Sequence, residues 1–211
     1  MKFAREGHTY MALAMALSVL ALASGSWCIA VPGLVLTGLV INFFRDPERV
    51  VPIGEQLITS PADGKIVAIT DVEHEDRYLR RDCRRVSIFM SPLNVHVNRI
   101  PVDGTVLHVA HSSGQFLPAY REKASDFNEQ NAVIVEDARG ERILFVQIAG
   151  RLARRIICKI TPGDRVRRGE RYGMIMVGSR LDLYLPPMVK LNVAMGEHVA
   201  AGETIIGSYA S

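Results

Sequence analysis

Hydrophobic and polar positions are distributed very differently in the first 44 residues and in the rest of the chain. Over 35 residues, from Tyr10 through Phe44, there is no Asp, Glu, Lys or Arg. A single helix of that length would measure roughly 52 Å at about 1.5 Å per residue, well beyond the ~30 Å hydrocarbon core of a bilayer. Helix-interrupting Gly, Ser and Pro residues occur at 25–26 and 32–33. The pattern therefore predicts two helical segments, at about 10–23 and 27–44.

Three interpretations of this apolar segment, residues 1–44, remain open. It forms one tilted membrane span with a flanking piece, or it forms a hairpin held in one leaflet of the bilayer. Alternatively, Lys2 and Arg5 before the apolar run and the small residues at 21–23 are typical of a cleavable signal peptide. Hydrophobic sequence resumes at once after that point, and for this reason retention as a membrane anchor is favoured.

The apolar segment ends abruptly in the sequence FFRDPER, residues 43–49. Two aromatic residues followed by arginine are typical of a membrane–water interface, so Arg45 and Arg49 are predicted to contact anionic lipid. We therefore expect a protein held at the cytoplasmic face of the cell membrane by its N-terminal segment.

Beyond Val50 the chain consists of short runs rich in β-branched residues, separated by Gly, Pro and Asp. Such spacing is typical of an all-β sandwich or barrel. Residues 45–211 number 167 and carry 23 Lys plus Arg and 21 Asp plus Glu, an ordinary composition for one globular domain with a single core. The predicted strands are Lys65–Ile69, Arg85–Met90, Ala132–Val135, Ile143–Ile148 and Met188–Val193.

Two internal echoes support the β prediction. PADGKIV at 61–67 matches PVDGTVL at 101–107, and GDRVRRGE at 163–170 matches GEHVAAGE at 196–203. The second pattern resembles the hairpins of biotinyl and lipoyl carrier domains, which implies a flattened β-barrel or sandwich hybrid. Laid over this chain, the carrier pattern puts its cofactor lysine at Ser179. A membrane-tethered carrier or adaptor module without catalysis is thus a rival interpretation, but this sequence has no lysine at the carrier position.

The remaining composition argues against several classes of function. The formal net charge is only +3, and no stretch interleaves basic and aromatic residues, so nucleic acid is not an expected partner. The cysteines Cys28, Cys83 and Cys158 are far apart, which supports neither a zinc site nor a disulfide scaffold. His108 and His111 lie three residues apart in a predicted strand and would face opposite sides of it. No metal site is therefore expected.

Four motifs occur in order along the chain. They are FFRDPER at 43–49, SPADG at 60–64, SPLNVHVNR at 91–99, and the pair Gly178-Ser179. Ser179 is the first of the last 33 residues. Together these motifs resemble the phosphatidylserine decarboxylase family, in its short bacterial and archaeal branch. The resemblance covers essentially the whole chain and includes NEQN at 128–131 and AGRLARR at 149–155.

The resemblance implies a proenzyme that cleaves itself between Gly178 and Ser179. Ser179 would become an N-terminal pyruvoyl group, the only cofactor, and the large chain 1–178 would stay associated with the small chain 179–211. The pyruvoyl group would form a Schiff base with phosphatidylserine in the membrane, and loss of CO2 would give phosphatidylethanolamine without a metal. Whether the protein forms a homo-oligomer is left open.

His96 is the residue that the resemblance favours as an acid–base group. Asn94, His96 and Asn98 alternate with valines and are predicted to share one face of a strand. In the long-chain branch of the family a second histidine follows three residues later, where this chain has Arg99. The resemblance therefore implies a catalytic role for His96 and substrate contacts for Asn94, Asn98 and Arg99.

Asp63 is the carboxylate that the resemblance offers as a partner for His96. An Asp-Gly pair is also an ordinary turn, and Asp103-Gly104 has the same form, so a purely structural role remains open. Arg154 and Arg155 belong to a basic cluster that leads toward the Gly-Ser pair. They are interpreted either as a solvated surface or as a contact with anionic lipid.

Overall fold

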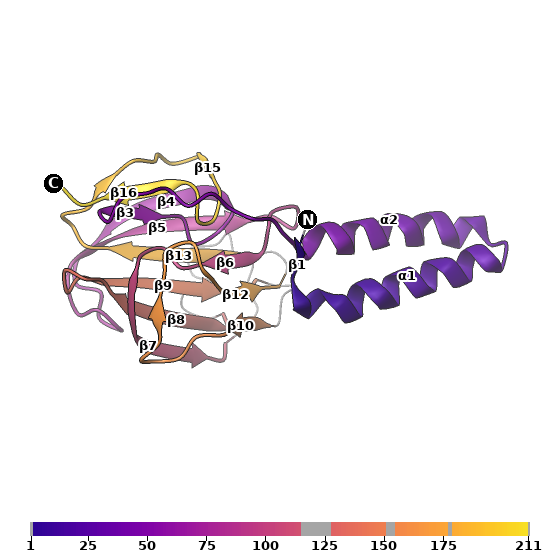
Figure 1. Cartoon of the computed structure of the whole chain (residues 1–211), viewed down its shortest axis with the longest axis horizontal. Coiled ribbons are helices and arrows are strands. Elements are labelled where there is room, and N and C mark those ends of the chain that lie inside the picture. The colour runs from indigo at the N-terminus through magenta and orange to yellow at the C-terminus, as the bar shows by residue number, and fades with distance from the viewer. Residues whose placement is uncertain (1, 115–127, 151–154, 177–178, 211) are drawn as a thin grey trace. The chain divides into compact units, whose positions relative to one another are not determined.

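In the computed structural model the chain divides into two compact units, Met1–Glu48 and Arg49–Ser211. The structure describes residues 2–114, 128–150, 155–176 and 179–210. The first unit is helical and the second is built of strands (Figure 1). The predicted combination of an apolar helical N-terminus and a mainly β remainder is therefore confirmed.

The first unit is an antiparallel helical hairpin (Figure 1). A single 3-10 turn, Arg5–Gly7, leads into α1 (His8–Ala23), and α2 (Trp27–Phe43) returns along it. Two short strands, β1 (Lys2–Phe3) and β2 (Arg45–Asp46), pair antiparallel and close the base of the hairpin.

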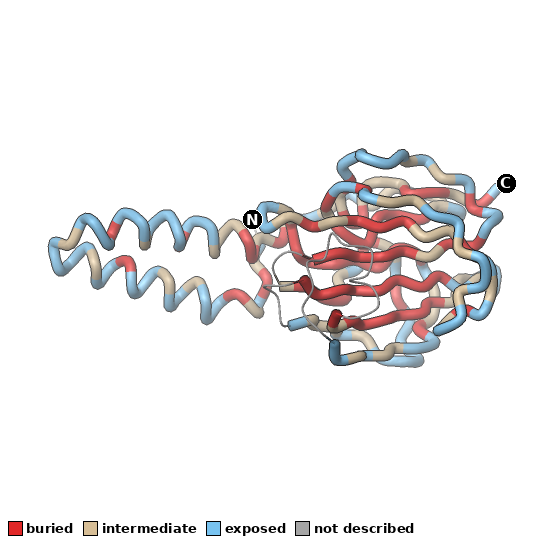
Figure 2. The backbone as a smooth tube through the Cα atoms, turned by 180° about the vertical axis from the view of Figure 1, so that it is seen from behind, coloured by how far each residue is buried: buried red, intermediate tan, exposed pale blue. Residues whose placement is uncertain are grey.

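Small side chains let the two helices pack closely. The hydroxyls of Ser18 and Thr37 share a hydrogen bond of 3.0 Å between α1 and α2, and a Cβ added at Gly33 would lie 3.1 Å from Ser18 Oγ. The chain turns at Gly25, whose φ is +73°. Pro32 lies inside α2, so the prediction that residues 32–33 also interrupt the helix was wrong. Most large apolar residues of both helices are exposed or only partly buried (Figure 2).

In the described part of the second unit all strands pair antiparallel and form three sheets. The eight-stranded sheet has the order β11-β7-β8-β9-β13-β5-β4-β15, and two three-stranded sheets have the orders β10-β12-β6 and β14-β16-β3. The bounds are β3 (Leu57–Thr59), β4 (Gly64–Val72), β5 (Cys83–Met90), β6 (Val97–Arg99), β7 (Gly104–Ser112), β8 (Gln130–Glu136), β9 (Arg142–Ile148), β10 (Ile156–Cys158), β11 (Arg165–Val166), β12 (Arg171–Ile175), β13 (Ser179–Leu185), β14 (Lys190–Leu191), β15 (His198–Val199) and β16 (Ile205–Ser208).

Four of the five predicted strands are confirmed, as β4, β5, β8 and β9. The prediction of a strand over Met188–Val193 was largely wrong, because only Lys190–Leu191 pairs, as β14. The central strands β8, β9 and β13 are buried on both faces (Figure 2). One face, with Phe145 and Leu181, belongs to the main core. The other face packs against Leu79 and Cys83 in a second hydrophobic cluster.

The internal echoes correspond to a repeat in three dimensions. β4 begins at Gly64 and pairs with β15, and β7 begins at Gly104 and pairs with β11 in the same register. At both glycines an added Cβ would lie 2.2 Å from a backbone carbonyl oxygen of the neighbouring strand, that of Phe89 or of Glu136. Each turn therefore requires glycine, because no side chain fits against that carbonyl.

Candidate active site

Ser179 begins β13, a strand in the middle of the large sheet. Its backbone is opposite Met90 of β5, its side chain is fully buried, and its hydroxyl donates a hydrogen bond of 3.5 Å to Met90 Sδ. A thioether is a weak acceptor, so this contact holds the hydroxyl only weakly. Gly178, the other half of the predicted cleavage site, lies outside the described residues.

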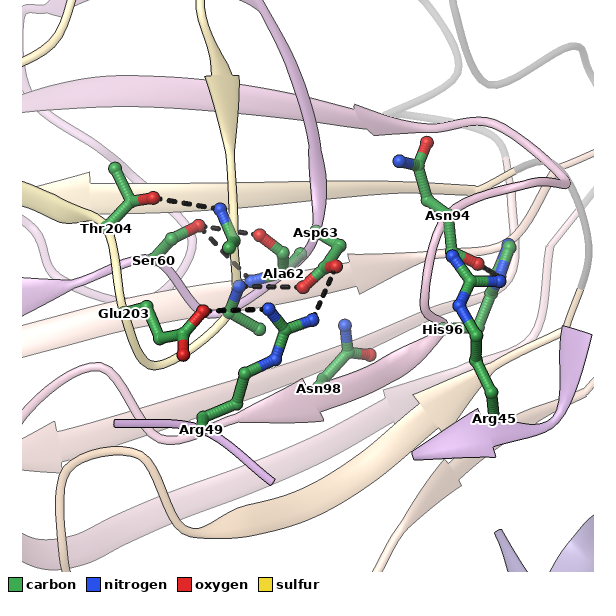
Figure 3. A network of polar contacts seen from close by, with 12 residues as sticks. Arg45, Arg49, Ser60, Ala62, Asp63, Asn94, His96, Asn98, Glu203 and Thr204 are labelled. Carbon is green, nitrogen blue, oxygen red and sulfur yellow. Dashed lines mark hydrogen bonds and ion pairs between the residues drawn. The ribbon is translucent and has the colours of Figure 1, made fainter. Parts of the chain in front are cut away.

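His96 is fully buried and directly precedes β6. Its Nδ1 atom lies 2.9 Å from the backbone oxygen of Asn94 (Figure 3). A carbonyl oxygen only accepts hydrogen bonds, so Nδ1 carries the proton and Nε2 of the neutral ring carries the lone pair. The Asn94 carbonyl thus fixes the tautomer that is able to act as a base at Nε2.

The Asp63 carboxylate binds the guanidinium of Arg49 and a backbone amide of the C-terminal region. Oδ2 lies 2.7 Å from Arg49 Nη2, and Oδ1 accepts a hydrogen bond of 2.8 Å from the backbone of Ala201 (Figure 3). Arg49 Nη1 also lies 2.9 Å from Glu203 Oε2. Hydrogen bonds from Val50 N–H and from Arg49 lower the pKa of Glu203. Burial alone would lower the pKa of Arg49, but the Glu203 and Asp63 carboxylates raise it overall.

This arrangement differs from one prediction made from the sequence. Arg49 was expected at a lipid surface, yet its side chain is only 12% exposed and lies between two carboxylates. Asp63 was expected to pair with His96, which stays a prediction; its carboxylate oxygens bind Arg49 and the Ala201 backbone. The turn that carries Asp63 is nevertheless bonded directly to the strand after His96, because Pro61 O accepts the Arg99 backbone N–H at 2.9 Å.

Asp103 is the structural counterpart of Asp63 in the other repeat. Asp103 Oδ1 accepts a hydrogen bond of 2.9 Å from the backbone of Arg168, which corresponds to Ala201 in the second echo. The shared task of the two aspartates is therefore to fasten a turn to the opposite hairpin. Only Asp63 also holds an arginine side chain.

The other residues of the 91–99 motif have different environments. Asn94 lies in a turn before the strand, and its Oδ1 accepts hydrogen bonds from the Ser91 backbone and hydroxyl. The Arg99 side chain is buried, and its Nη1 donates to Gly169 O at 2.9 Å. Because side chains alternate along a strand, Arg99 and Asn98 lie on opposite faces of β6. Arg99 therefore does not take the place of a histidine side chain on the face of β6 that carries Asn98.

Three buried amides lie at the end of the main core face, next to Ser179. Asn131 Nδ2 donates to Gln147 Oε1 at 3.0 Å, and Gln147 Nε2 donates to Asn98 Oδ1 at 3.0 Å. Asn98 Nδ2 in turn lies 3.5 Å from Pro61 O and 3.8 Å from Met90 Sδ, the atom that also contacts Ser179. The sequence analysis identified only Asn98. Asn131 precedes a run of apolar residues and Gln147 interrupts one, and a polar side chain in such a place ordinarily signals exposure.

The arginines predicted to contact lipid have separate positions. Arg45 Nη1 donates to Asn42 O at 2.8 Å at the base of the helical hairpin. Arg155 is exposed, and its carbonyl accepts the Met176 backbone N–H at 3.2 Å, two residues before Gly178. Arg154 lies outside the described residues.

Among the described residues no group of three His, Cys, Asp or Glu side chains is arranged to hold a metal ion. His108 and His111 have different neighbours: the first ring is 6.3 Å from the Tyr78 ring, and the second lies 3.4 Å from Glu129 Oε1. Burial, with a smaller contribution from the Glu75 charge, raises the pKa of the Cys83 thiol to about 11. Cys83 is thus protonated near neutral pH and is a poor nucleophile.

Comparisons with known proteins identify the family. The sequence model described as phosphatidylserine decarboxylase matches residues 36–207. A phosphatidylserine decarboxylase proenzyme of Syntrophus aciditrophicus is 48% identical over 184 residues, which covers 87% of this chain and 85% of the relative. The proenzymes of Geotalea uraniireducens and Nitrosomonas eutropha are 44% and 42% identical, and they cover 97% and 98% of this chain and 95% and 94% of their own lengths. The chain belongs to the phosphatidylserine decarboxylase family.

Proposed function

We propose that this chain is a proenzyme that cleaves itself between Gly178 and Ser179 and then decarboxylates phosphatidylserine at a pyruvoyl group formed from Ser179. The observation that carries the proposal is the burial of the Ser179 hydroxyl at the start of a central strand, in a chain that belongs to this family. The same observation argues against the carrier alternative, because position 179 holds serine where a carrier needs an exposed lysine.

For self-cleavage, the Ser179 hydroxyl must attack the Gly178 carbonyl carbon while a base removes its proton. We assign that base to His96, because its Nδ1–H is held by the Asn94 carbonyl and its Nε2 lone pair is the one that accepts a proton. The Gly178–Ser179 peptide bond breaks as the ester forms, and its nitrogen takes up a proton to become the amino group of Ser179. The ester then loses the Ser179 α-proton, and the bond from Ser179 Cβ to the ester oxygen breaks with release of the Gly178 carboxylate. The dehydroalanine that remains is hydrolysed to the pyruvoyl group, and ammonia leaves.

Asp63 is assigned as the acidic partner that stabilises the charged form of His96. Its carboxylate forms an ion pair with the Arg49 guanidinium, and the Asp63 turn is bonded to β6 through Pro61. Asn94, Asn98 and Arg99 are the remaining residues of the motif. Of these, Asn98 is the one whose side-chain amide is linked to Ser179, because both contact the sulfur atom of Met90.

The residues around position 179 are suited to a pyruvoyl group. Such a group brings a ketone carbonyl, which accepts hydrogen bonds and supplies the electron sink for decarboxylation when the substrate amine is bound. Among the described residues the contacts of the buried donor Asn98 Nδ2 are two long ones, and it is available for such an oxygen. Met90 and the surrounding apolar side chains exclude water from the same place.

We further propose that the helical hairpin associates with the membrane that contains the substrate. The helix over Arg5–Ala23 is long and apolar enough to cross a bilayer, and α2 is a somewhat shorter apolar helix. Their large apolar side chains are exposed, which is costly in water and favourable in lipid. Arg45 and the exposed Arg155 remain candidates for contacts with anionic lipid, whereas the buried Arg49 does not support that role.

We also infer that the repeated turns of the β unit are the counterpart of the paired hairpins of biotinyl and lipoyl carrier domains. The supporting feature is the matched pair of glycine turns: φ is +96° and +78° at Gly163 and Gly169, and +91° and +75° at Gly196 and Gly202.

The test is the intact mass of purified wild type and of Ser179→Ala. Wild type should give two chains separated before residue 179, with the 33-residue small chain blocked to Edman chemistry, and should release CO2 from phosphatidylserine vesicles. Ser179→Ala should remain one chain of 211 residues and release none. Ser87→Ala is the matched control, because Ser87 is also buried in the large sheet but lies on β5, opposite Asp182. Wild type that stays a single chain would refute the proposal.

A further inference from the structure

We propose that the relay of buried amides from Asn131 through Gln147 to Asn98 sets the orientation of the Asn98 amide, so that Nδ2 donates a hydrogen bond to the oxygen at position 179. In this assignment Gln147 and Asn131 are positioning residues for the reaction, although neither of them contacts Ser179. The inference rests on the proposed function and extends it to residues on two further strands.

The relay crosses the end of the main core face. Asn131 and Gln147 are directly opposite each other on β8 and β9, and β9 is followed in the sheet by β13 with Ser179 and by β5 with Met90. Elsewhere this face is apolar, with residues such as Val133 and Phe145. Asn98 reaches the same place from β6, in another sheet.

The direction of the relay is fixed by groups that can act in one way only. Pro61 O is a carbonyl oxygen and only accepts, so the end of the Asn98 amide that faces it must be Nδ2. Oδ1 then faces Gln147 Nε2 at 3.0 Å, and Gln147 Oε1 is left to accept from Asn131 Nδ2 at 3.0 Å. One choice of orientation therefore determines all three amides.

The energetic cost of this arrangement points to a functional role. Asn98 and Gln147 are fully buried and Asn131 is 2% exposed, and each amide loses hydration that its hydrogen bonds only partly replace. The two contacts of Asn98 Nδ2, at 3.5 Å and 3.8 Å, are long for hydrogen bonds and one of them is to sulfur. The relay thus ends in a donor that is oriented but weakly used.

Such a donor suits the chemistry at position 179 in two stages. When the proton leaves Ser179 Oγ, negative charge develops next to Met90 Sδ, the atom that Asn98 Nδ2 also contacts. In the later elimination the same oxygen leaves as part of the Gly178 carboxylate and again becomes negatively charged. A donor whose direction is fixed beforehand stabilises this oxygen in both steps without having to reorient during the reaction.

The decisive variant is Asn131→Asp, which changes the far end of the relay. An ionised carboxylate at this position cannot donate to Gln147 Oε1. Gln147 must then turn its Nε2 toward position 131, Asn98 must turn its Nδ2 toward Gln147, and Asn98 Oδ1 faces residue 179. The donor is replaced by an acceptor. We expect self-cleavage at pH 8 to slow by roughly 100- to 1,000-fold, which is typical of losing one donor to an oxyanion.

Acid should restore the relay in this variant. A protonated carboxyl has an O–H group that donates as Asn131 Nδ2 does, and burial keeps the pKa of a carboxyl at this site above its usual value of about 3.9. Self-cleavage of Asn131→Asp relative to wild type should therefore rise as the pH falls from 8 to 5. Two titratable side chains near this position, His111 across the β7–β8 pair and Glu129 just before β8, are the same in both proteins, as is His96, so the ratio at each pH cancels their titration.

Asn131→Leu is the matched control, because it removes the donor without reversing the relay. Its ratio to wild type should not change with pH. Gln147→Glu is a second variant in case Asn131→Asp does not fold, because its carboxylate accepts from both neighbours and should again reverse Asn98. Thermal unfolding of each variant identifies the folded ones.

The outcomes separate the two proposals. A pH-dependent ratio in Asn131→Asp together with a flat ratio in Asn131→Leu supports the relay. The relay is overturned if wild type cleaves and the variants Asn131→Asp and Gln147→Glu either match its rate at every pH or are slowed by the same factor at every pH. That outcome leaves the proposed function intact. Wild type that does not cleave overturns the proposed function itself.

Discussion

Asp63 and Asp103 occupy equivalent places in the two repeats, and this equivalence separates a structural role from a catalytic one. Both accept a backbone N–H of the opposite hairpin, at 2.8 Å and 2.9 Å. Asp63 alone also binds Arg49, and of the two it is the one assigned as the acidic partner of His96. A comparison of the two positions therefore isolates what Asp63 contributes beyond its turn.

We predict that Asp63→Asn slows self-cleavage more than about tenfold, because an uncharged amide no longer stabilises the imidazolium form of His96. Asp103→Asn should cleave within a factor of about two of wild type. Each substitution weakens a charge-assisted backbone hydrogen bond, which should lower the free energy of unfolding by about 1 kcal/mol. Asp63→Asn should lower it further, because it also breaks the ion pair with the largely buried Arg49. The measurements are the rate of appearance of the small chain and urea unfolding. Equal cleavage rates would mean that Asp63 is only a turn residue.

Local sequence patterns identified some site residues and missed others for a physical reason. Ser179 and His96 lie in short motifs that are recognised without the fold. Gln147 and Asn131 become related only when β8 and β9 pair, and their burial depends on β6 covering them from another sheet. Arg49 was assigned to a lipid surface because its partner Glu203 comes from the far end of the chain.

At the scale of elements, the sequence predicted strands well where β-branched residues alternate or form runs, as in β8 and β9. It failed at Met188–Val193, where two prolines precede a segment that pairs over only two residues. The helical segments were located correctly because an uncharged run leaves few alternatives. The effect of Pro32 was misjudged, since the α2 helix continues through it.

The hairpin leads to a prediction about depth in the membrane. With 16 and 17 residues, α1 and α2 are each about 25 Å long, slightly less than the ~30 Å hydrocarbon core. The turn at 24–26 exposes backbone groups that need water. We therefore expect both helices to cross the bilayer and the turn to reach the opposite interface.

Trp27, the only tryptophan in the chain, begins α2 next to this turn and is 69% exposed. With the protein added to preformed vesicles of anionic phospholipid, iodide trapped inside should quench its fluorescence and iodide outside should not. Trp27→Phe, which removes the signal, is the control for stray fluorescence. Quenching only from outside would place the hairpin on the surface, and no quenching from either side would place its tip within the bilayer.

At the scale of the whole molecule, the segment proposed to become the small chain is distributed over the β unit. β13 lies between β9 and β5, β15 pairs with β4 at one edge of the same sheet, and β16 pairs with β3 in a second sheet. Leu181 and Leu183 lie in the main core. The sequence predicted one β domain, but local patterns do not specify which distant strands pair, so this distribution could not be derived from them.

We therefore predict that self-cleavage does not release residues 179–211. The wild type should elute as one species in gel filtration at pH 7, with both chains present on a denaturing gel, and the chains should separate only in denaturant beyond the unfolding transition. Glu203→Gln tests whether strand pairing or the Arg49 ion pair retains the small chain. Because Glu203 is partly exposed, its loss should lower the unfolding midpoint slightly and leave the chains together. A small chain that elutes separately without denaturant would contradict the argument, because removing β13 would leave β9 and β5 without the strand between them.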